Sequence, residues 1–433
     1  MQGISYFPYV ESHLVEKYEL DGTLITSSTT QNEYDSYGNP TNITMTHSDG
    51  YRNTTVNRYH NDPNKWHLGR LLESKVTAKA PEQAAQTRTS SFEYDPNSGL
   101  LIKEVEEPGT PLEVTKVYEH DSFGNIVRST ISGPDITDRT QTSEYDPSGR
   151  FAIRNTNPLG HTEERQYDPR IGQPTRLVDP NGLVTTWEYD GFGRQTRETR
   201  PDGTQTIHFY RLCEGNCPQN AHYYHQTETS GANQAVGYLD ILDRPIRHES
   251  TGFDGRKVYV DTEYNERGEK ARVSEPYYED ETPIWTTYSY DDVGRLLTQT
   301  DPDGSVMSSS YEGLTTKVVN ALNQTTVRTL NSQGWLVQST DNLGNSINYT
   351  HDSVGNVIQV VDSAGNTTTL EYDRKGRKVA MSDPDMGTVS YQYNTIGELT
   401  AQTDAKKQTV SMSYDKLGSC KRRRNKKTLT QRR

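Results

Sequence analysis

The sequence has little of what a conventional apolar core requires. Only 30% of its 433 residues are hydrophobic, and it has just 7 Phe and 4 Trp, which is low for a packed globular protein. No stretch approaches the roughly 20 apolar residues of a membrane-spanning helix. A net charge of −13 with so few apolar residues is also typical of disordered chains. The acidic balance argues against general nucleic-acid binding.

Cysteine and the common catalytic motifs are also scarce. The chain has 3 Cys, too few for a framework of several disulfides. It has no Gly-x-Ser-x-Gly nucleophile elbow, no Gly-x-x-x-x-Gly-Lys phosphate loop and no His-Glu-x-x-His metal motif. We therefore expect no enzymatic activity, no cofactor and no structural metal.

Tyrosine, glycine and aspartate, in contrast, recur at regular intervals. The chain has 28 Tyr, and many of them begin the element Tyr-Asp-x-x-Gly, often followed by Arg or Asn. Weak copies included, the anchor positions 330, 351, 372, 393 and 414 are each 21 residues apart, which indicates an internal repeat. The expected turn residues of five copies are Asp35 and Gly38, Asp190 and Gly193, Asp291 and Gly294, Asp373 and Gly376, and Asp415 and Gly418.

Each period carries a second turn signal about half-way along, such as Asp301-Pro302-Asp303-Gly304. Asp opens such turns, Pro presets φ, and Gly supplies the positive φ that closes them. A calcium loop would need further oxygen ligands and a closing Glu, so turn chemistry explains these Asp residues better. Two turns per period leave two segments of typical strand length, which predicts one β-hairpin per period.

The segments between the turns alternate as strands do. Val389, Tyr391 and Tyr393 fall on one face, and Ser390 and Gln392 on the other. Because an isolated hairpin is marginal in water, we expect consecutive hairpins to share one sheet. The predicted fold is all-β: tandem antiparallel hairpins forming a long curved ribbon or part of a β-shell. Residues 1–90 form a β region before the regular repeats, which occupy 91–418.

An insertion around 211–235 breaks the repeat register and contains Cys213-Glu214-Gly215-Asn216-Cys217. A disulfide between Cys213 and Cys217 is favoured over two thiols. A zinc site formed by both cysteines with His222 and His225 is the least favoured alternative, because the cysteine spacing departs from the commoner Cys-x2-Cys pairs.

An aromatic cluster lies between residues 277 and 290. Tyr288 and Tyr290 follow the repeat pattern, so we expect them to pack on the sheet. Tyr277, Tyr278 and Trp285 lie off the pattern and are the predicted contacts for a ligand such as a polysaccharide.

Residues 419–433 depart from the repeat just after Gly418. This tail has eight Lys or Arg and no acid, whereas residues 1–418 carry 38 basic and 59 acidic residues, a net of −21. A basic arm for nucleic acid or acidic lipid is one interpretation. The favoured hypothesis is that translation left the repeat's frame here, so that the tail is disordered and the last hairpin exposes an edge strand.

Repeats of Tyr-Asp-x-x-Gly-Arg/Asn alternating with Asp-Pro-x-Gly resemble the Rhs/YD-repeat family, which includes bacterial Rhs toxins, the B and C components of Tc toxin complexes, and teneurins. The resemblance implies a hollow β-shell that encloses a toxic polypeptide, with other shell parts or toxin-complex components as partners. The family's self-cleaving core motif has no counterpart here.

The first hypothesis is therefore a non-catalytic, truncated shell segment, secreted or on the cell surface. The alternative is a surface module that binds carbohydrate or protein. The N-terminus has no signal-peptide pattern, so we expect another export route or a start within a longer protein.

Overall fold

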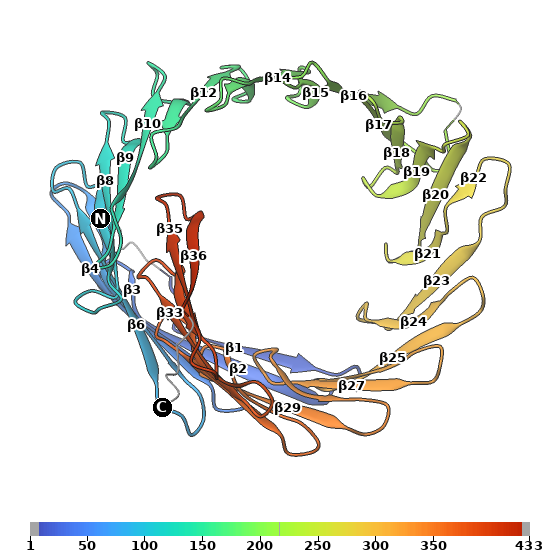
Figure 1. The fold of residues 1–433 in the computed structure, drawn as a ribbon. Coiled ribbons are helices and arrows are strands. Elements are labelled where there is room, and N and C mark those ends of the chain that lie inside the picture. The colour runs from blue at the N-terminus through green and yellow to red at the C-terminus, as the bar shows by residue number, and fades with distance from the viewer. Residues whose placement is uncertain (1–7, 216, 427–433) are drawn as a thin grey trace, which may run out of the picture.

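The described part of the chain folds into β-strands joined by turns, as the repeat predicts. The computed structural model describes residues 8–215 and 217–426, and these contain 36 strands and no helix (Figure 1). Among the described residues there is accordingly no helix with the length and apolar character needed to cross a membrane. The predicted all-β fold is confirmed.

The strands of the first half are β1 (Ser12–Tyr18), β2 (Leu24–Tyr34), β3 (Pro40–His47), β4 (Arg52–Asp62), β5 (His67–Lys79), β6 (Gln86–Tyr94), β7 (Leu101–Glu106), β8 (Val114–His120), β9 (Ile126–Ser132), β10 (Arg139–Tyr145), β11 (Ala152–Thr156), β12 (Thr162–Tyr167), β13 (Pro174–Val178), β14 (Val184–Tyr189), β15 (Gln195–Thr199), β16 (Gln205–Leu212), β17 (Tyr223–Thr229) and β18 (Ala235–Leu239). Those of the second half are β19 (Pro245–Thr251), β20 (Lys257–Tyr264), β21 (Lys270–Ser274), β22 (Tyr277–Tyr278), β23 (Trp285–Tyr290), β24 (Leu296–Thr300), β25 (Val306–Glu312), β26 (Thr315–Val319), β27 (Thr325–Leu330), β28 (Leu336–Thr340), β29 (Ser346–His351), β30 (Val357–Val361), β31 (Thr367–Tyr372), β32 (Lys378–Asp383), β33 (Gly387–Tyr393), β34 (Leu399–Thr403), β35 (Thr409–Tyr414) and β36 (Cys420–Lys426).

The strands pair antiparallel with their neighbours in sequence and form one sheet. The order changes only near β20, which pairs with both β21 and β22, while β21 pairs with β23. The register shifts by one residue at many anchor tyrosines, including Tyr189, Tyr290 and Tyr393. Such bulges increase the local twist of a strand pair, so their repetition contributes to the bending of the ribbon.

The ribbon winds into a superhelix of more than one circuit around an open centre (Figure 1). The first circuit runs from β1 through the top of the view, and strands β23–β36 return over the starting strands. The turns that follow the anchor position lie along one edge of the ribbon, which we call the anchor rim. The half-way turns lie along the other edge, which we call the mid-period rim.

Burial is spread thinly over the sheet. No large side chain in the described residues is fully buried. In β33 the pattern follows the predicted alternation, with Val389 buried, Tyr391 and Tyr393 half-buried, and Ser390 exposed. The leading strands β24 and β30 are half-buried on both faces, which accounts for their adjacent apolar residues. Stability therefore depends on contacts between repeats, as in other solenoids.

The predicted insertion is smaller than residues 211–235. Strands β16, β17 and β18 pair without interruption, so only the connection 213–222 is extra. Tyr210 occupies an anchor position there, 21 residues after Tyr189, but Arg211 stands where the repeat has Asp.

The expectation of a disordered tail is wrong for residues 420–426. The backbone of β36 pairs with β35 in the repeat register, with Cys420 opposite Tyr414 as Leu399 is opposite Tyr393. The Asp415 turn still reverses the chain, and ladder hydrogen bonds use backbone groups that any residue but Pro provides. Residues 427–433 lie outside the described part of the chain.

Candidate functional site: anchor turns, inner face and inter-turn seam

The anchor turn is built around its aspartate. Oδ1 of Asp291 accepts hydrogen bonds from the backbone N–H groups of Val293 (3.1 Å) and Arg295 (2.8 Å). Oδ2 accepts one from Arg295 Nε at 2.6 Å. This geometry explains why Arg or Asn follows the glycine, since either side chain can donate to the second carboxylate oxygen. Asp35, Asp190 and Asp373 make the equivalent bonds, and Asp415 makes the two backbone ones.

The turn glycines adopt the backbone conformation that this turn needs. The φ angles of Gly38, Gly193, Gly294, Gly376 and Gly418 are 83°, 79°, 84°, 77° and 83°. Only glycine enters this region without a steric penalty. Burial raises the pKa of Asp291, but hydrogen bonds from Arg295 and the backbone outweigh it and leave the pKa below its ordinary value. The carboxylate is thus held charged within the turn.

The same arginine links one repeat to the next. The guanidinium of Arg295 lies 4.6 Å from the ring centre of Tyr311, and Tyr311 donates a 2.9 Å hydrogen bond to the carbonyl of Leu296. Arg194 over Tyr210 and Arg377 over Tyr393 repeat the stacking at 4.4 and 5.1 Å. A charged group over an aromatic ring is stabilising. The motif therefore serves as a latch between hairpins.

Tyr210 and Tyr311 were missed as anchors by sequence reasoning, because neither is followed by Asp or Asn. The signal was present, since they lie 21 residues after Tyr189 and Tyr290.

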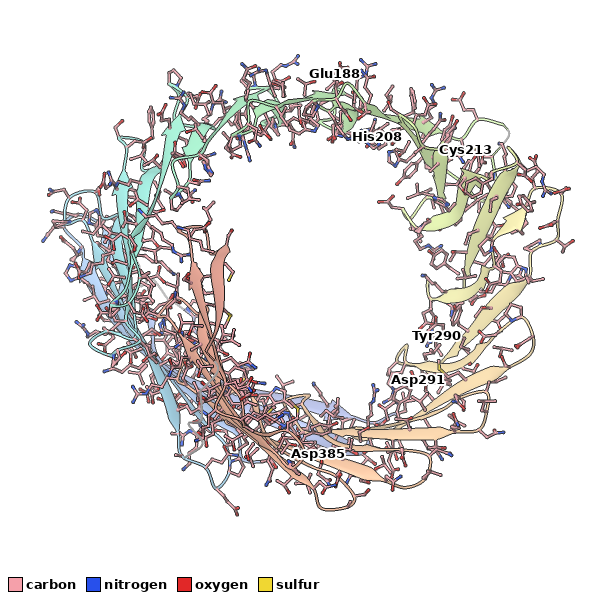
Figure 2. The ribbon with its side chains drawn as sticks, viewed as in Figure 1. Glu188, His208, Cys213, Tyr290, Asp291 and Asp385 are labelled. Atoms are coloured by element: carbon pink, nitrogen blue, oxygen red, sulfur yellow. A yellow bond between two sulfur atoms is a disulfide. The ribbon has the colours of Figure 1, made fainter. Side chains whose placement is uncertain are left out.

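The two faces of the sheet point into and out of the ring. In Figure 2, His208 points toward the open centre and Glu188 points outward. The strand register agrees with the figure. Glu188 lies opposite Arg197, and Arg197 lies opposite Ile207, so these three side chains share the outer face. His208 follows Ile207 in the strand and therefore lies on the inner face. The centre stays open with side chains drawn (Figure 2). The inner face thus lines a lumen.

A histidine pair lies on this inner face. His208 Nδ1 and His225 Nε2 are 3.0 Å apart, and the ring of Tyr210 stacks on His225 at 4.6 Å with Arg194 on its other side. Thr227 Oγ1 is 3.4 Å from His208 Nδ1. Burial lowers the pKa of His225, and the charge of a protonated His208 lowers it further.

We predict that acid weakens the β16–β17 hairpin through this pair. Because the pKa of folded His225 lies below its ordinary value of about 6.5, its contribution is present above that value and is lost as pH falls through the lower folded pKa. Substituting His208→Gln should raise the pKa of His225, as NMR titration of the imidazole signals would measure. An unchanged titration of His225 in this variant would refute the coupling.

Cys213 and Cys217 are placed in disulfide geometry, with their Cα atoms 5.8 Å apart, and a disulfide between them in solution stays a prediction. His225 pairs with His208, and no group of three or more metal-ligating side chains occurs in residues 8–215 and 217–426.

The pairing predicts a clear result in solution. Intact mass after alkylation should show two more labels with reductant than without it, and Cys213→Ser should abolish the difference. Equal labelling, or stoichiometric zinc in the purified protein, would contradict the disulfide.

The predicted ligand contacts each pack against polar groups of the sheet. Tyr277 is 8% exposed, and its hydroxyl donates to Asp261 (2.6 Å) and accepts from Arg247 (3.0 Å). Burial, together with the bond to Asp261, raises its pKa to about 12. Arg256 lies over Tyr278 at 3.5 Å, and Arg272 lies over Trp285 at 4.2 Å. Tyr277 thus packs within the sheet, and a ligand role for these residues stays a prediction.

The second circuit rests on the first along what we call the inter-turn seam, where the anchor rim of β23–β34 meets the mid-period rim of β1–β10. Carboxylates of the first circuit accept backbone N–H groups of the anchor-rim turns above them. The pairs are Glu19 with Gly313 (2.9 Å), Asp49 with Ser332 (3.2 Å) and Asp135 with Thr395 (2.9 Å). Their members are 260 to 294 residues apart in sequence.

Ion pairs reinforce the seam. They join Arg139 to Glu398 (2.7 Å), Arg295 to Glu19 (3.1 Å) and Lys375 to Glu106 (3.5 Å). The Arg295 guanidinium beside Glu19 holds the pKa of that carboxyl below its usual range.

Much of the molecule's burial falls in or beside the seam. Asp352 and Thr395 are 3% and 2% exposed. Trp335 meets the ring of Tyr51 edge-on at 5.4 Å. Gly133 lies against Thr395 with no room for a side chain. The seam therefore joins segments that no sequence pattern connects.

Comparisons with known proteins agree with this geometry. Residues 167–205, 281–306 and 351–388 match the RHS Repeat family model. No curated protein sequence matches the chain significantly.

Several solved structures share the fold. The crystal structure of TcdB2-TccC3 matches with a TM-score of 0.76 at 12% identity, over 97% of this chain and 32% of that one. TcdB2-TccC3-Cdc42 matches with a TM-score of 0.75 at 11% identity, over 97% and 34%. A mutant Tc holotoxin pore of Photorhabdus luminescens matches with a TM-score of 0.75 at 10% identity, over 95% and 32%. The chain thus spans about a third of these chains. The chain therefore carries three segments that match the RHS Repeat family model and shares its fold with these Tc toxin structures.

Proposed function

We propose that this chain is a non-catalytic wall segment of an Rhs/Tc-type β-shell that encloses a polypeptide cargo. The observation that carries the proposal is the seam, because it holds two circuits of the ribbon together around a lumen. The fold shared with TcdB2-TccC3 over 97% of the chain supports it. Further shell parts would be its partners, and a secreted or cell-surface location would follow from that role.

The repeat chemistry favours a structural role over catalysis. The anchor aspartates, which are the most regular titratable groups, hold turns through backbone N–H bonds and arginine. Hydrogen bonds to the charged form of a carboxylate lower its pKa, as they do for Asp291, and make it a weaker base. Neither self-cleavage nor toxicity is part of the proposal.

The test uses the two faces of the sheet. A photoreactive amino acid would replace either His208 or Glu188 in the protein expressed in its native host. A shell segment should cross-link a cargo polypeptide from position 208, inside the ring, and not from position 188, outside it. Cross-links from 188 alone would support a surface-binding module, and equal cross-linking from both sites, or none from 208, would contradict enclosure.

A further inference from the structure

The seam uses only part of each rim. It covers the anchor rim from β23 onward and the mid-period rim up to β10. The anchor rim of the first circuit and the mid-period rim of the second circuit have no counterpart among the described residues. One uncovered rim is an anchor rim and the other is a mid-period rim, and the seam likewise joins an anchor rim to a mid-period rim.

The uncovered turns carry apolar side chains at their tips. Phe192, on the anchor rim, is 88% exposed, and Leu343, on the mid-period rim, is 83% exposed. In the seam, Val354 occupies the turn position of Phe192 and is 38% exposed. Val293, at the same turn position in the seam, is 63% exposed, so the apolar tips are contacts that a partner on these rims would cover in part.

The polar groups that form the seam are also present on the uncovered rims. Asp49, which accepts the Ser332 N–H in the seam, is the third residue of its turn. Asp303 is third in the Asp301–Gly304 turn and is exposed. On the other rim, Gly191 is the second residue of its turn, the position that Ser332 has in the seam. The backbone N–H of Gly191 donates to no acceptor within the described residues. Asp303 Oδ1 accepts hydrogen bonds from the backbone N–H and the hydroxyl of Ser305 (2.8 and 2.5 Å), so the second oxygen, Oδ2, is the seam-type acceptor that this rim offers to a partner.

We propose that a second copy of this chain docks head to tail on the first, with the anchor rim around Phe192 of one copy on the mid-period rim around Asp303 and Leu343 of the other. The occupant is a second copy because the same two rims already fit each other within one chain. The screw that lays the second circuit on the first would lay the next copy on the second circuit. Such an interface is heterologous and does not close, so it produces open stacks.

Two rim variants test the proposal by complementation. Phe192→Asp blocks the anchor rim and Leu343→Asp blocks the mid-period rim, and both side chains are exposed, so the fold should be kept. Analytical ultracentrifugation of the wild-type chain should show mass that rises with concentration beyond a dimer. Each variant alone should remain monomeric, with an association constant at least tenfold lower. An equimolar mixture should form a dimer and nothing larger, because each copy keeps one intact rim.

Three results would overturn the proposal. The wild-type chain could stay monomeric at every concentration. Both variants could self-associate as well as the wild type, which would indicate pairing through an edge strand instead. The mixture could also fail to form the mixed dimer. None of these results bears on cargo cross-linking from the lumen, so this proposal and the proposed function fail separately.

Discussion

Reversing the charge of Glu398 (Glu398→Arg) is expected to open the seam around Asn394, at a cost of about 3 kcal/mol, which is typical for breaking a buried ion pair from one side. Arg139 Nη2 donates to both carboxylate oxygens of Glu398, at 2.7 and 2.8 Å. Their side chains are only 16% and 13% exposed, so solvent screens the pair little. The substitution would leave two like charges facing each other in this setting.

Hydrogen exchange resolved by residue measures the effect. Amides of the Asn394 turn and of the β9–β10 turn should exchange faster together, while those of β14 and β15 remain unchanged. The double swap Arg139→Glu, Glu398→Arg should restore most of the protection. Glu188→Arg is the matched control, because the pair of Glu188 and Arg197 is exposed and such pairs contribute about 0–1 kcal/mol. Equal effects at Glu188 and Glu398 would contradict a stabilising seam.

Gly376→Val is expected to destabilise its anchor turn by about 1–3 kcal/mol, the usual cost of forcing a β-branched residue into positive φ. The φ of Gly376 is +77°, and a Cβ there would also lie 3.0 Å from Arg88 Nη2. Arg88 belongs to the first circuit and donates to the carbonyl of Arg374. The substitution should thus strain the turn and disturb the seam together.

Gly365→Val separates the two effects. Gly365 has φ +84° but lies on the mid-period rim, where a Cβ would meet nothing within 4 Å. We expect Gly365→Val to lower the unfolding midpoint through backbone strain alone and Gly376→Val to lower it further. An unchanged midpoint for Gly376→Val would show that this glycine is not needed for the turn.

The repeat and its turns could be predicted because they are local. Each anchor turn is specified by an aspartate and a glycine three residues apart, and the spacing of the turns sets the strand length. The hairpin order followed, because neighbouring strands pair across short turns. Tyr210 and Tyr311 nevertheless escaped prediction, because the aspartate of the motif does not follow them. Each still makes a contact of the latch between hairpins.

The seam could not be predicted, because it depends on how far the ribbon bends and climbs in one circuit. Asp135 and Thr395 meet although 260 residues separate them, and small changes of twist at each bulge add up over that distance. Neither residue belongs to a motif that would mark it. The burial of Tyr277 could not be predicted either. It arises because β22 departs from the regular strand order and pairs with β20.

The most direct test of the account is a cysteine cross-link across the seam. In a Cys420→Ser background, Asp49→Cys and Ser332→Cys are combined, because the Asp49 carboxylate and the Ser332 N–H are 3.2 Å apart. The control combines Asp49→Cys with Leu343→Cys, which lies on the uncovered rim of the second circuit. A superhelix with stacked circuits predicts a rapid disulfide within one chain for the first pair and not for the second. A folded protein in which the two thiols introduced at positions 49 and 332 fail to join, or in which both pairs join equally, would contradict it.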